Sequence, residues 1–132
     1  METELAIAEM NRVYLVEDSA PIRERLVSLL DEIDGVRVVG AAETANQATA
    51  DILRTRPDTV VLDIRLAQGS GLDVLRAVHP RVPEIMFIVL TNFANPQYRK
   101  ICMDAGASHF IDKSNEIASV KHIVASFVPV RH

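Results

Sequence analysis

The amino-acid sequence predicts an α/β domain in which five parallel strands form a doubly wound sheet with helices on both faces. Short apolar segments alternate five times with segments in which apolar residues recur at helical spacing. The connections between them are short and contain proline and glycine. Two of the apolar segments, residues 59–63 and 85–90, consist almost wholly of β-branched and aliphatic residues, which is typical of parallel strands buried on both faces.

The first strand is expected at residues 12–16, which are mostly apolar. A helix follows it, because Pro21 suits a first helical turn and leucine and isoleucine then recur at helical spacing. The Asp34–Gly35 pair is expected to end this helix, with the glycine in a left-handed cap. Residues 36–41 then form the second strand.

Thr44 is expected to cap the second helix, whose inner face is small and aliphatic and which Pro57 stops. The third strand, residues 59–63, ends on the carboxylate of Asp63. A short third helix begins at Gly71 and ends before a pair of prolines.

Residues 85–90 form the fourth expected strand, which is again continuously apolar. A fourth helix is expected over residues 96–105, and residues 108–111 form a short fifth strand. Ser114 or Asn115 is expected to cap the last helix, which carries apolar residues at helical spacing.

A chain of 132 residues suggests one domain, expected over residues 11–128 between terminal tails at residues 1–10 and 129–132. The formal net charge of −4 and the scattered arginines give no support for nucleic-acid binding. No apolar segment approaches the length of a membrane span, and the acidic N-terminus lacks the basic start of a secretion signal. The single cysteine, Cys102, cannot form an internal disulfide, so we expect a cytoplasmic protein without a membrane partner.

Polar side chains end four of the five strands: Glu17 and Asp18 the first, Asp63 the third, Thr91 the fourth and Lys113 the fifth. Because the carboxyl ends of parallel strands share one edge of a sheet, these side chains are expected to converge. Three carboxylates in one pocket repel each other, and a divalent cation removes that cost. Oxygen ligands with room for water suit Mg²⁺, and the lysine and threonine add an anion-binding charge and a hydroxyl donor. The combination predicts a phosphoryl-transfer site.

These motifs, taken together and in order, resemble the receiver domain of two-component response regulators over about residues 11–127. The resemblance implies a flavodoxin-like (βα)5 fold with strand order 2-1-3-4-5. The motifs that carry it are Leu15-Val16-Glu17-Asp18, Val60-Val61-Leu62-Asp63, Val89-Leu90-Thr91, Ala105-Gly106-Ala107 and Phe110-Ile111-Asp112-Lys113.

The resemblance also implies a role for each site residue. Asp63 would be the phosphoacceptor, taking a phosphoryl group from a phosphohistidine on a sensor histidine kinase or a histidine phosphotransfer protein. Asp18 would bind Mg²⁺ directly, Glu17 directly or through water, and the backbone carbonyl of Arg65 would complete the protein ligands. Lys113 would bind a phosphoryl oxygen.

Thr91 would bind another phosphoryl oxygen and move on phosphorylation, with Phe110 as the aromatic switch that turns inward behind it. Output would then change on the surface formed by the helix at residues 96–105, the fifth strand and the last helix, where a downstream effector protein would bind. Such a domain catalyses its own phosphorylation and dephosphorylation without being a turnover enzyme, and it can form a homodimer.

Four positions depart from the common pattern of this family, and one of them is Ala67, which stands four residues after the phosphoacceptor where the family often has proline. The acid pair is Glu17–Asp18 rather than two aspartates, a variant that keeps magnesium binding plausible. Asn92 follows the switch threonine where the family usually has alanine or glycine, and it could crowd the phosphoryl pocket or alter its access to water. Ser114 follows Lys113 where the family often has a proline in a cis bond. The lysine loop is therefore expected either to be trans or to store strain, since a non-proline cis bond costs about 2.5–4 kcal/mol.

Other readings stay open to different degrees. An isolated Asp63 would more often cap a loop or a helix than carry chemistry. A phosphatase or phosphotransferase with an aspartyl nucleophile is disfavoured, because it would carry the nucleophile after the first strand with a second acid two residues later, where this chain has Glu17-Asp18-Ser19-Ala20. A pseudo-receiver that binds partners without phosphorylation is one alternative. Within the receiver interpretation, the output is open. The chain could be a stand-alone regulator, a phosphorelay intermediate or the excised receiver of a longer, DNA-binding regulator.

Overall fold

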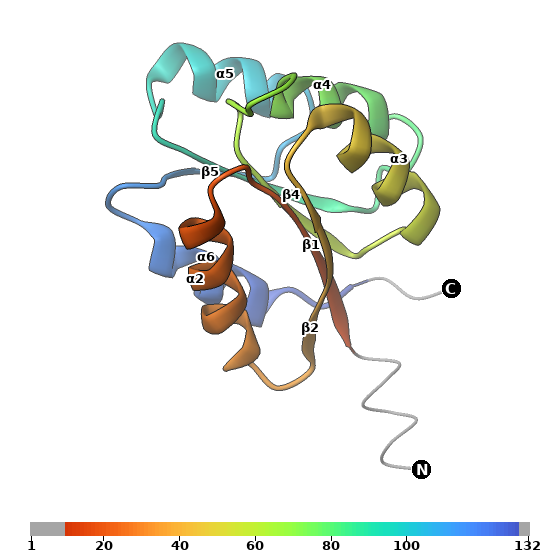
Figure 1. The fold of residues 1–132 in the computed structure, drawn as a ribbon, viewed down its shortest axis with the longest axis vertical. Helices are drawn as coiled ribbons and strands as arrows, with labels where there is room; N and C mark the ends of the chain where they lie inside the picture. The colour runs from red at the N-terminus through yellow and green to blue at the C-terminus, as the bar shows by residue number, and fades with distance from the viewer. Residues whose placement is uncertain (1–9, 130–132) are drawn as a thin grey trace.

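The computed structural model describes residues 10–129, so the expected terminal tails lie almost wholly outside the described residues. Within them, strands and helices alternate as the sequence predicts (Figure 1). The strands are β1 (Asn11–Val16), β2 (Val36–Ala42), β3 (Thr59–Leu62), β4 (Met86–Thr91) and β5 (His109–Asp112). The helices are α2 (Ala20–Asp31), α3 (Ala45–Thr55), α4 (Gly71–Val78), α5 (Pro96–Asp104) and α6 (Ile117–Ser126).

All five strands are parallel and lie in the order β2-β1-β3-β4-β5, which confirms the flavodoxin-like, doubly wound fold expected from the sequence. Figure 1 shows the two helical layers: α3, α4 and α5 cover one face of the sheet, and α2 and α6 cover the other. The central strand β3 pairs with β1 on one side and β4 on the other. The ends of β1, β3 and β4 therefore lie side by side.

The side chains of β3 explain why a sheet covered on both faces needs a continuously apolar strand. Val60 and Leu62 join the core under α3, α4 and α5, while Val61 points to the opposite face and joins the core under α2 and α6. All three side chains are at most 1% exposed. Burying a valine or leucine fully stabilises a fold by about 1.5–3 kcal/mol, so β3 anchors both layers to the sheet.

Two helix ends differ from the expectation. The first helix, α2, ends at Asp31 with Glu32 as its C-cap, three residues before the expected Asp34–Gly35 end. Gly35 does take a left-handed conformation, with φ of 81°, but it serves the turn into β2. Its carbonyl accepts a hydrogen bond from the Asn11 N–H at the start of β1, so these residues are held by the sheet instead of continuing the helix.

The last helix, α6, begins at Ile117 after Glu116, so the predicted caps at Ser114 and Asn115 are wrong. The Ser114 hydroxyl and N–H both donate to the carboxylate of Asp112, at 2.6 and 2.9 Å. Ser114 is therefore committed to the turn after β5 and cannot cap the helix. At the second helix the prediction is confirmed, because the Thr44 hydroxyl accepts the Gln47 N–H at 3.3 Å.

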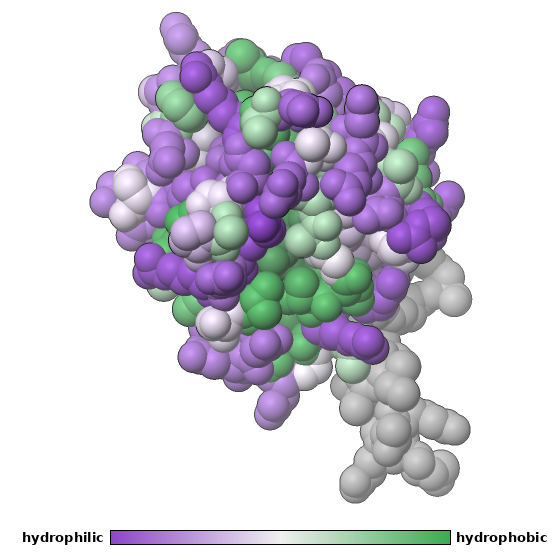
Figure 2. Space-filling model, viewed as in Figure 1, coloured by the Kyte–Doolittle hydropathy of each residue, from purple (hydrophilic) through white to green (hydrophobic). Residues whose placement is uncertain are grey.

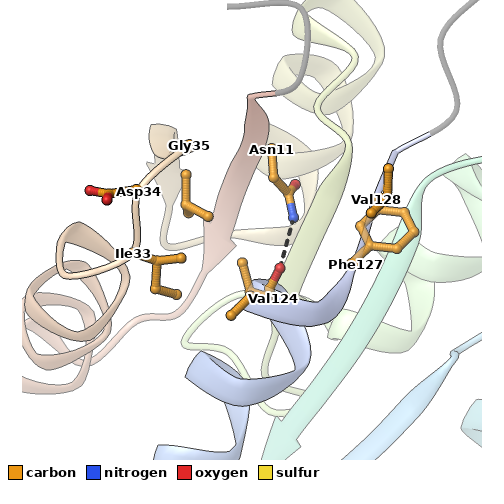
Figure 3. A pocket seen from close by; sticks show the side chains of 9 residues that line it. Asn11, Ile33, Asp34, Gly35, Val124, Phe127 and Val128 are labelled. Atoms are coloured by element: carbon orange, nitrogen blue, oxygen red, sulfur yellow. Dashed lines mark hydrogen bonds between the residues drawn. The ribbon is translucent and has the colours of Figure 1, made fainter. Parts of the chain in front are cut away.

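The surface in Figure 2 is mainly hydrophilic, with a hydrophobic area where α6 ends beside the first strands. Figure 3 shows a hollow at this place, with Ile33, Val124 and Phe127 in its lining and the Asn11 amide donating to the Val124 carbonyl at 3.4 Å. This hollow lies at the amino ends of the strands, away from the polar strand ends. No helix in the described part of the chain is long and apolar enough to cross a membrane.

Candidate functional site

The predicted site residues follow the carboxyl ends of neighbouring strands. Glu17 comes directly after β1 and Asp63 directly after β3, and the register of these strands pairs Val16 with Leu62. The Asp63 N–H continues this ladder by donating to the Val16 carbonyl at 3.0 Å. The sheet therefore places the two carboxylates beside each other, as expected from the sequence.

Asp63 is held in a tight loop and is only 6% exposed. One of its carboxylate oxygens, Oδ1, accepts the N–H of Arg65 at 3.3 Å. The loop closes when the Gly71 N–H, at the start of α4, donates to the Ile64 carbonyl at 2.8 Å. A side chain at position 71 would place its Cβ 1.9 Å from the Asp63 carbonyl oxygen. Glycine is therefore required here so that α4 can begin directly against the Asp63 backbone.

The three acids Glu17, Asp18 and Asp63 each offer a carboxylate oxygen, and these oxygens lie within 4.8 Å of one another. Glu17 and Asp63 are buried, whereas Asp18 is partly exposed. Burial raises the pKa of Glu17 above its ordinary value, and hydrogen bonds from Lys113 and Ser19 offset part of that rise. A set of oxygen-only donors, one of them open to solvent, fits a Mg²⁺ ion that keeps several of its waters.

Lys113 supplies the positive charge of this cluster. Its Nζ lies 2.7 Å from Asp63 Oδ2 and 2.5 Å from Glu17 Oε1, so one ammonium group contacts both buried carboxylates. Burial alone would lower the pKa of Lys113, but the hydrogen bonds and charges of the two acids raise it above its ordinary value. The Lys113 N–H donates to the Thr91 carbonyl at 2.9 Å, which fixes the lysine to the end of β4.

Thr91 is fully buried at the end of β4, and its hydroxyl oxygen accepts the Phe93 N–H at 3.2 Å. The next residue, Asn92, is exposed. Phe110 lies on β5 opposite Val89, so by strand alternation it shares a face of the sheet with Val89 and Thr91. It is half-buried against the core under α3, α4 and α5. The switch roles of Thr91 and Phe110 stay predictions.

The structure thus brings Glu17, Asp18, Asp63 and Lys113 into one cluster. No hydrogen bond or ion pair among the described residues joins the Arg65 carbonyl to it, so that predicted ligand stays a prediction. The peptide bond after Lys113 is trans, as are all other bonds in the described segment, which decides between the two expectations for that loop.

Sequence reasoning missed two side-chain contacts beside the cluster. The Arg23 guanidinium donates to the Glu17 carbonyl at 2.8 Å and pairs with Glu43 at 3.0 Å, which ties the acid loop to α2 and to the loop after β2. The Arg65 guanidinium lies 4.0 Å from the centroid of the Phe93 ring. Both contacts have at least one partner in a loop, where the sequence carries no periodic signal.

Comparison with known proteins gives consistent matches. The family model described as the response regulator receiver domain matches residues 13–125. The DNA-binding transcriptional activator DevR/DosR of Mycobacterium tuberculosis is 35% identical over 104 residues, which cover 79% of this chain and 48% of the relative. A protein-glutamate methylesterase/protein-glutamine glutaminase of Syntrophus aciditrophicus is 31% identical over 106 residues, covering 79% of this chain and 30% of the relative. The chain thus spans about half or less of these two curated relatives.

Solved structures agree with the fold. A two-component response regulator of the LuxR family from Aurantimonas sp. superposes with a TM-score of 0.80 at 26% identity, covering 92% of this chain and 89% of the other. The response regulator domain of Thermotoga maritima CheB superposes with a TM-score of 0.78 at 23% identity, covering 87% and 90% of the two chains.

Proposed function

Because the family model covers most of its length, the chain belongs to the response regulator receiver domains of two-component systems, and from this premise we propose that it accepts a phosphoryl group on Asp63 in a Mg²⁺-dependent reaction. One observation carries the proposal. A single buried ammonium group, that of Lys113, contacts both Asp63 and Glu17, and Asp18 adds a third carboxylate within reach of the same ion. This arrangement supports the proposal, because a nucleophilic carboxylate, a cation and metal-binding acids are the groups that assist phosphoryl transfer.

In the proposed reaction, a carboxylate oxygen of Asp63 attacks the phosphorus of a phosphohistidine on a sensor kinase or a phosphotransfer protein. A new O–P bond forms as the N–P bond breaks, and the bonding electrons leave with the imidazole. Mg²⁺, held by Asp18, Asp63, Glu17 directly or through water, and the Arg65 carbonyl, would neutralise charge that develops on the phosphoryl oxygens. The domain is consumed one for one in this step, so it catalyses its own modification without being a turnover enzyme.

In this proposal two side chains hold the phosphoryl group. Lys113 Nζ donates to Asp63 Oδ2 at 2.7 Å, which supports a role for its ammonium group in binding an oxygen of a phosphoryl group on Asp63. The Thr91 hydroxyl oxygen already accepts the Phe93 N–H, so its own proton is free to donate to a second phosphoryl oxygen. These groups act as fixed donors toward charge that increases during transfer.

The output proposed for this domain is a change of the surface formed by α5, β5 and α6. Thr91 and Phe110 share one face of the sheet, so a movement of the threonine toward the phosphoryl group would leave room for the ring to turn inward. Lys113 connects the site to the end of β5 through its own backbone. The effector is a protein in this proposal, whether it is a separate partner, a second copy or a further domain of the kind that longer relatives have room for.

Phosphotransfer from purified sensor histidine kinases carrying radiolabelled phosphate tests the proposal. Wild type and Asp73→Asn, which removes an exposed acid of the neighbouring helix α4, are expected to take up label from a cognate kinase only with Mg²⁺. Asp63→Asn is expected to take up none. Equal labelling of Asp63→Asn, or no transfer from any kinase of the host, would contradict the proposal and favour a pseudo-receiver.

A further inference from the structure

Arg23, near the start of α2, holds the backbone of the acid loop. One of its guanidinium nitrogens donates to the Glu17 carbonyl at 2.8 Å, and the other lies 3.0 Å from the Glu43 carboxylate. The Arg23 side chain is 22% exposed, whereas that of Glu43, in the loop between β2 and α3, is 59% exposed. The planar fork of an arginine holds two acceptors in one fixed geometry, which the compact ammonium group of a lysine does not reproduce.

These two contacts complete a closed path around the Glu17 backbone. The Glu17 N–H donates to the Ala42 carbonyl at 3.0 Å, and Glu43 follows Ala42 directly in the chain. Both backbone groups of Glu17 are therefore bound to the end of β2, the N–H directly and the carbonyl through Arg23.

Asp18 depends on this backbone more than its neighbour does. The Glu17 side chain is bound at both oxygens, since Oε1 pairs with Lys113 and Oε2 accepts the Ser19 N–H at 3.1 Å. Asp18 is partly exposed, and within the described residues no hydrogen bond or ion pair holds its carboxylate. The place of that carboxylate is therefore set by the peptide units on either side, and Arg23 binds the carbonyl of the preceding one.

We propose that Arg23 and Glu43 act together as positioning residues for the metal site, holding the peptide before Asp18 so that its carboxylate can bind a divalent cation. The inference rests on the proposed function and adds two residues outside the acid cluster to it. Removing a group that orients a metal ligand typically weakens metal binding about 10- to 100-fold. Arg23 orients the backbone of the ligand and not its carboxylate, so a smaller effect of roughly three- to tenfold is expected.

The electric field of the arginine has the opposite effect on metal binding, which makes the contact testable. Arg23→Gln removes a positive charge near the site, so the field alone would let Mg²⁺ bind more tightly. Loss of the hydrogen bond to the Glu17 carbonyl would instead make Mg²⁺ bind more weakly. Arg23→Lys keeps the charge and removes the fork. Arg25→Gln makes the same charge change at an exposed position on α2 and is the matched control.

Mg²⁺ binding by the intact chain is followed by calorimetric titration. Arg23→Lys and Arg23→Gln are both expected to bind Mg²⁺ roughly three- to tenfold more weakly than wild type, and Arg25→Gln is expected to bind it no more weakly. Glu43→Gln is expected to bind it about two- to threefold more weakly, the range of one exposed ion pair. In a double-mutant cycle the separate field effects cancel, so Glu43→Gln should change the affinity less in the Arg23→Gln background than in wild type.

Amide hydrogen exchange of the metal-free protein gives a second readout. The Ser19 N–H, which is bound to Glu17 Oε2, should exchange faster in Arg23→Lys than in wild type, by a factor similar to the loss in Mg²⁺ affinity. Amides in the middle of β1 should exchange at the wild-type rate. Urea unfolding separates a merely structural role, which would lower the free energy of unfolding and leave both the Mg²⁺ affinity and the Ser19 exchange unchanged.

Three results would overturn the inference: wild-type Mg²⁺ affinity in Arg23→Lys, tighter binding in Arg23→Gln, or unchanged exchange of the Ser19 N–H. A wild type that binds no Mg²⁺ and takes up no phosphoryl group would overturn the proposed function together with this inference. A wild type that binds Mg²⁺ and is phosphorylated, with Arg23 variants of equal Mg²⁺ affinity, would overturn the positioning role alone.

Discussion

Replacing Lys113 with methionine tests how much its positive charge stabilises the buried acids Glu17 and Asp63. The substitution keeps an unbranched side chain of similar length and removes the ammonium group that lies 2.5 Å from Glu17 and 2.7 Å from Asp63. The two carboxylates are 2% and 6% exposed, so they would stay buried without a cation. Removing one partner of a buried ion pair costs about 3–5 kcal/mol, and we expect the free energy of unfolding to fall by that amount in the absence of divalent ions.

Magnesium is expected to reverse much of this loss, because the ion supplies the charge that the variant lacks. A ligand at a hundred times its Kd stabilises a folded protein by about 2.7 kcal/mol, and the gain should be larger for Lys113→Met than for wild type. Urea unfolding with and without Mg²⁺ measures both quantities. Lys100→Met removes an exposed ammonium that pairs with Asp104 at 2.9 Å and is the control, with a far smaller loss and no response to Mg²⁺.

The pH dependence has a defined sign. The pKa of Lys113 is raised above its ordinary 10.5, so its stabilising effect is complete below pH 10.5 and is lost as pH rises through the folded-state pKa. The pKa of Glu17 is also raised, so Glu17 stabilises the fold most below its ordinary 4.5 and less as pH rises through the folded-state pKa. Without Lys113 the pKa of Glu17 should rise further. The loss in free energy of unfolding of Lys113→Met, relative to wild type, should therefore be smaller in acid. Two results would refute this account. One is a loss in the free energy of unfolding of Lys113→Met below about 1 kcal/mol, as expected for a surface ion pair. The other is equal stabilisation of wild type and Lys113→Met by Mg²⁺.

Three further predictions concern residues around the cluster. Gly71→Ala places a Cβ 1.9 Å from a backbone oxygen of the phosphoacceptor loop, so it should lower both stability and Mg²⁺ affinity. Gly35 has a φ of 81° and open space around it, so Gly35→Ala should lower stability without lowering Mg²⁺ affinity. Equal Mg²⁺ affinity in the Gly71→Ala and Gly35→Ala variants would contradict the role of Gly71 in the site. Asn92→Ala should speed phosphorylation by acetyl phosphate, as followed by intact mass, and an unchanged rate would show that the asparagine does not hinder small donors. Ser114→Ala should raise the pKa of Asp112 toward its ordinary 3.8, because the serine hydroxyl and N–H hold it low; carboxyl NMR titration measures this, and an unchanged pKa would count against the assignment.

The sequence predicted the sheet because its strands carry unambiguous patterns. Val60, Val61 and Leu62 alternate between two buried faces, and such a strand can only be apolar throughout. The polar residues after the strands were equally readable, since parallel strands end at one edge of the sheet. The shared edge and the strand order that the family resemblance implies together predicted the convergence of Asp63 and Lys113.

Side-chain pairing in the loops could not be predicted in the same way. Ser114 is a residue type that often caps helices, but its hydroxyl and N–H both donate to Asp112 in the turn before α6 begins. The contact between Arg65 and Phe93 joins two loops whose directions depend on the whole sheet. Sequence patterns report periodic structure well and report such competition between local partners poorly.

Intact-protein mass spectrometry of wild type and Asp63→Asn tests the central claim most directly. Each protein is incubated with acetyl phosphate, and in parallel with a phosphorylated sensor kinase, with Mg²⁺ or with a chelator. The account predicts a mass increase of one phosphoryl group in wild type only, dependent on Mg²⁺ and lost in hydroxylamine, as an acyl phosphate should be. The same increase in Asp63→Asn, or an unmodified wild type under both donors, would contradict it.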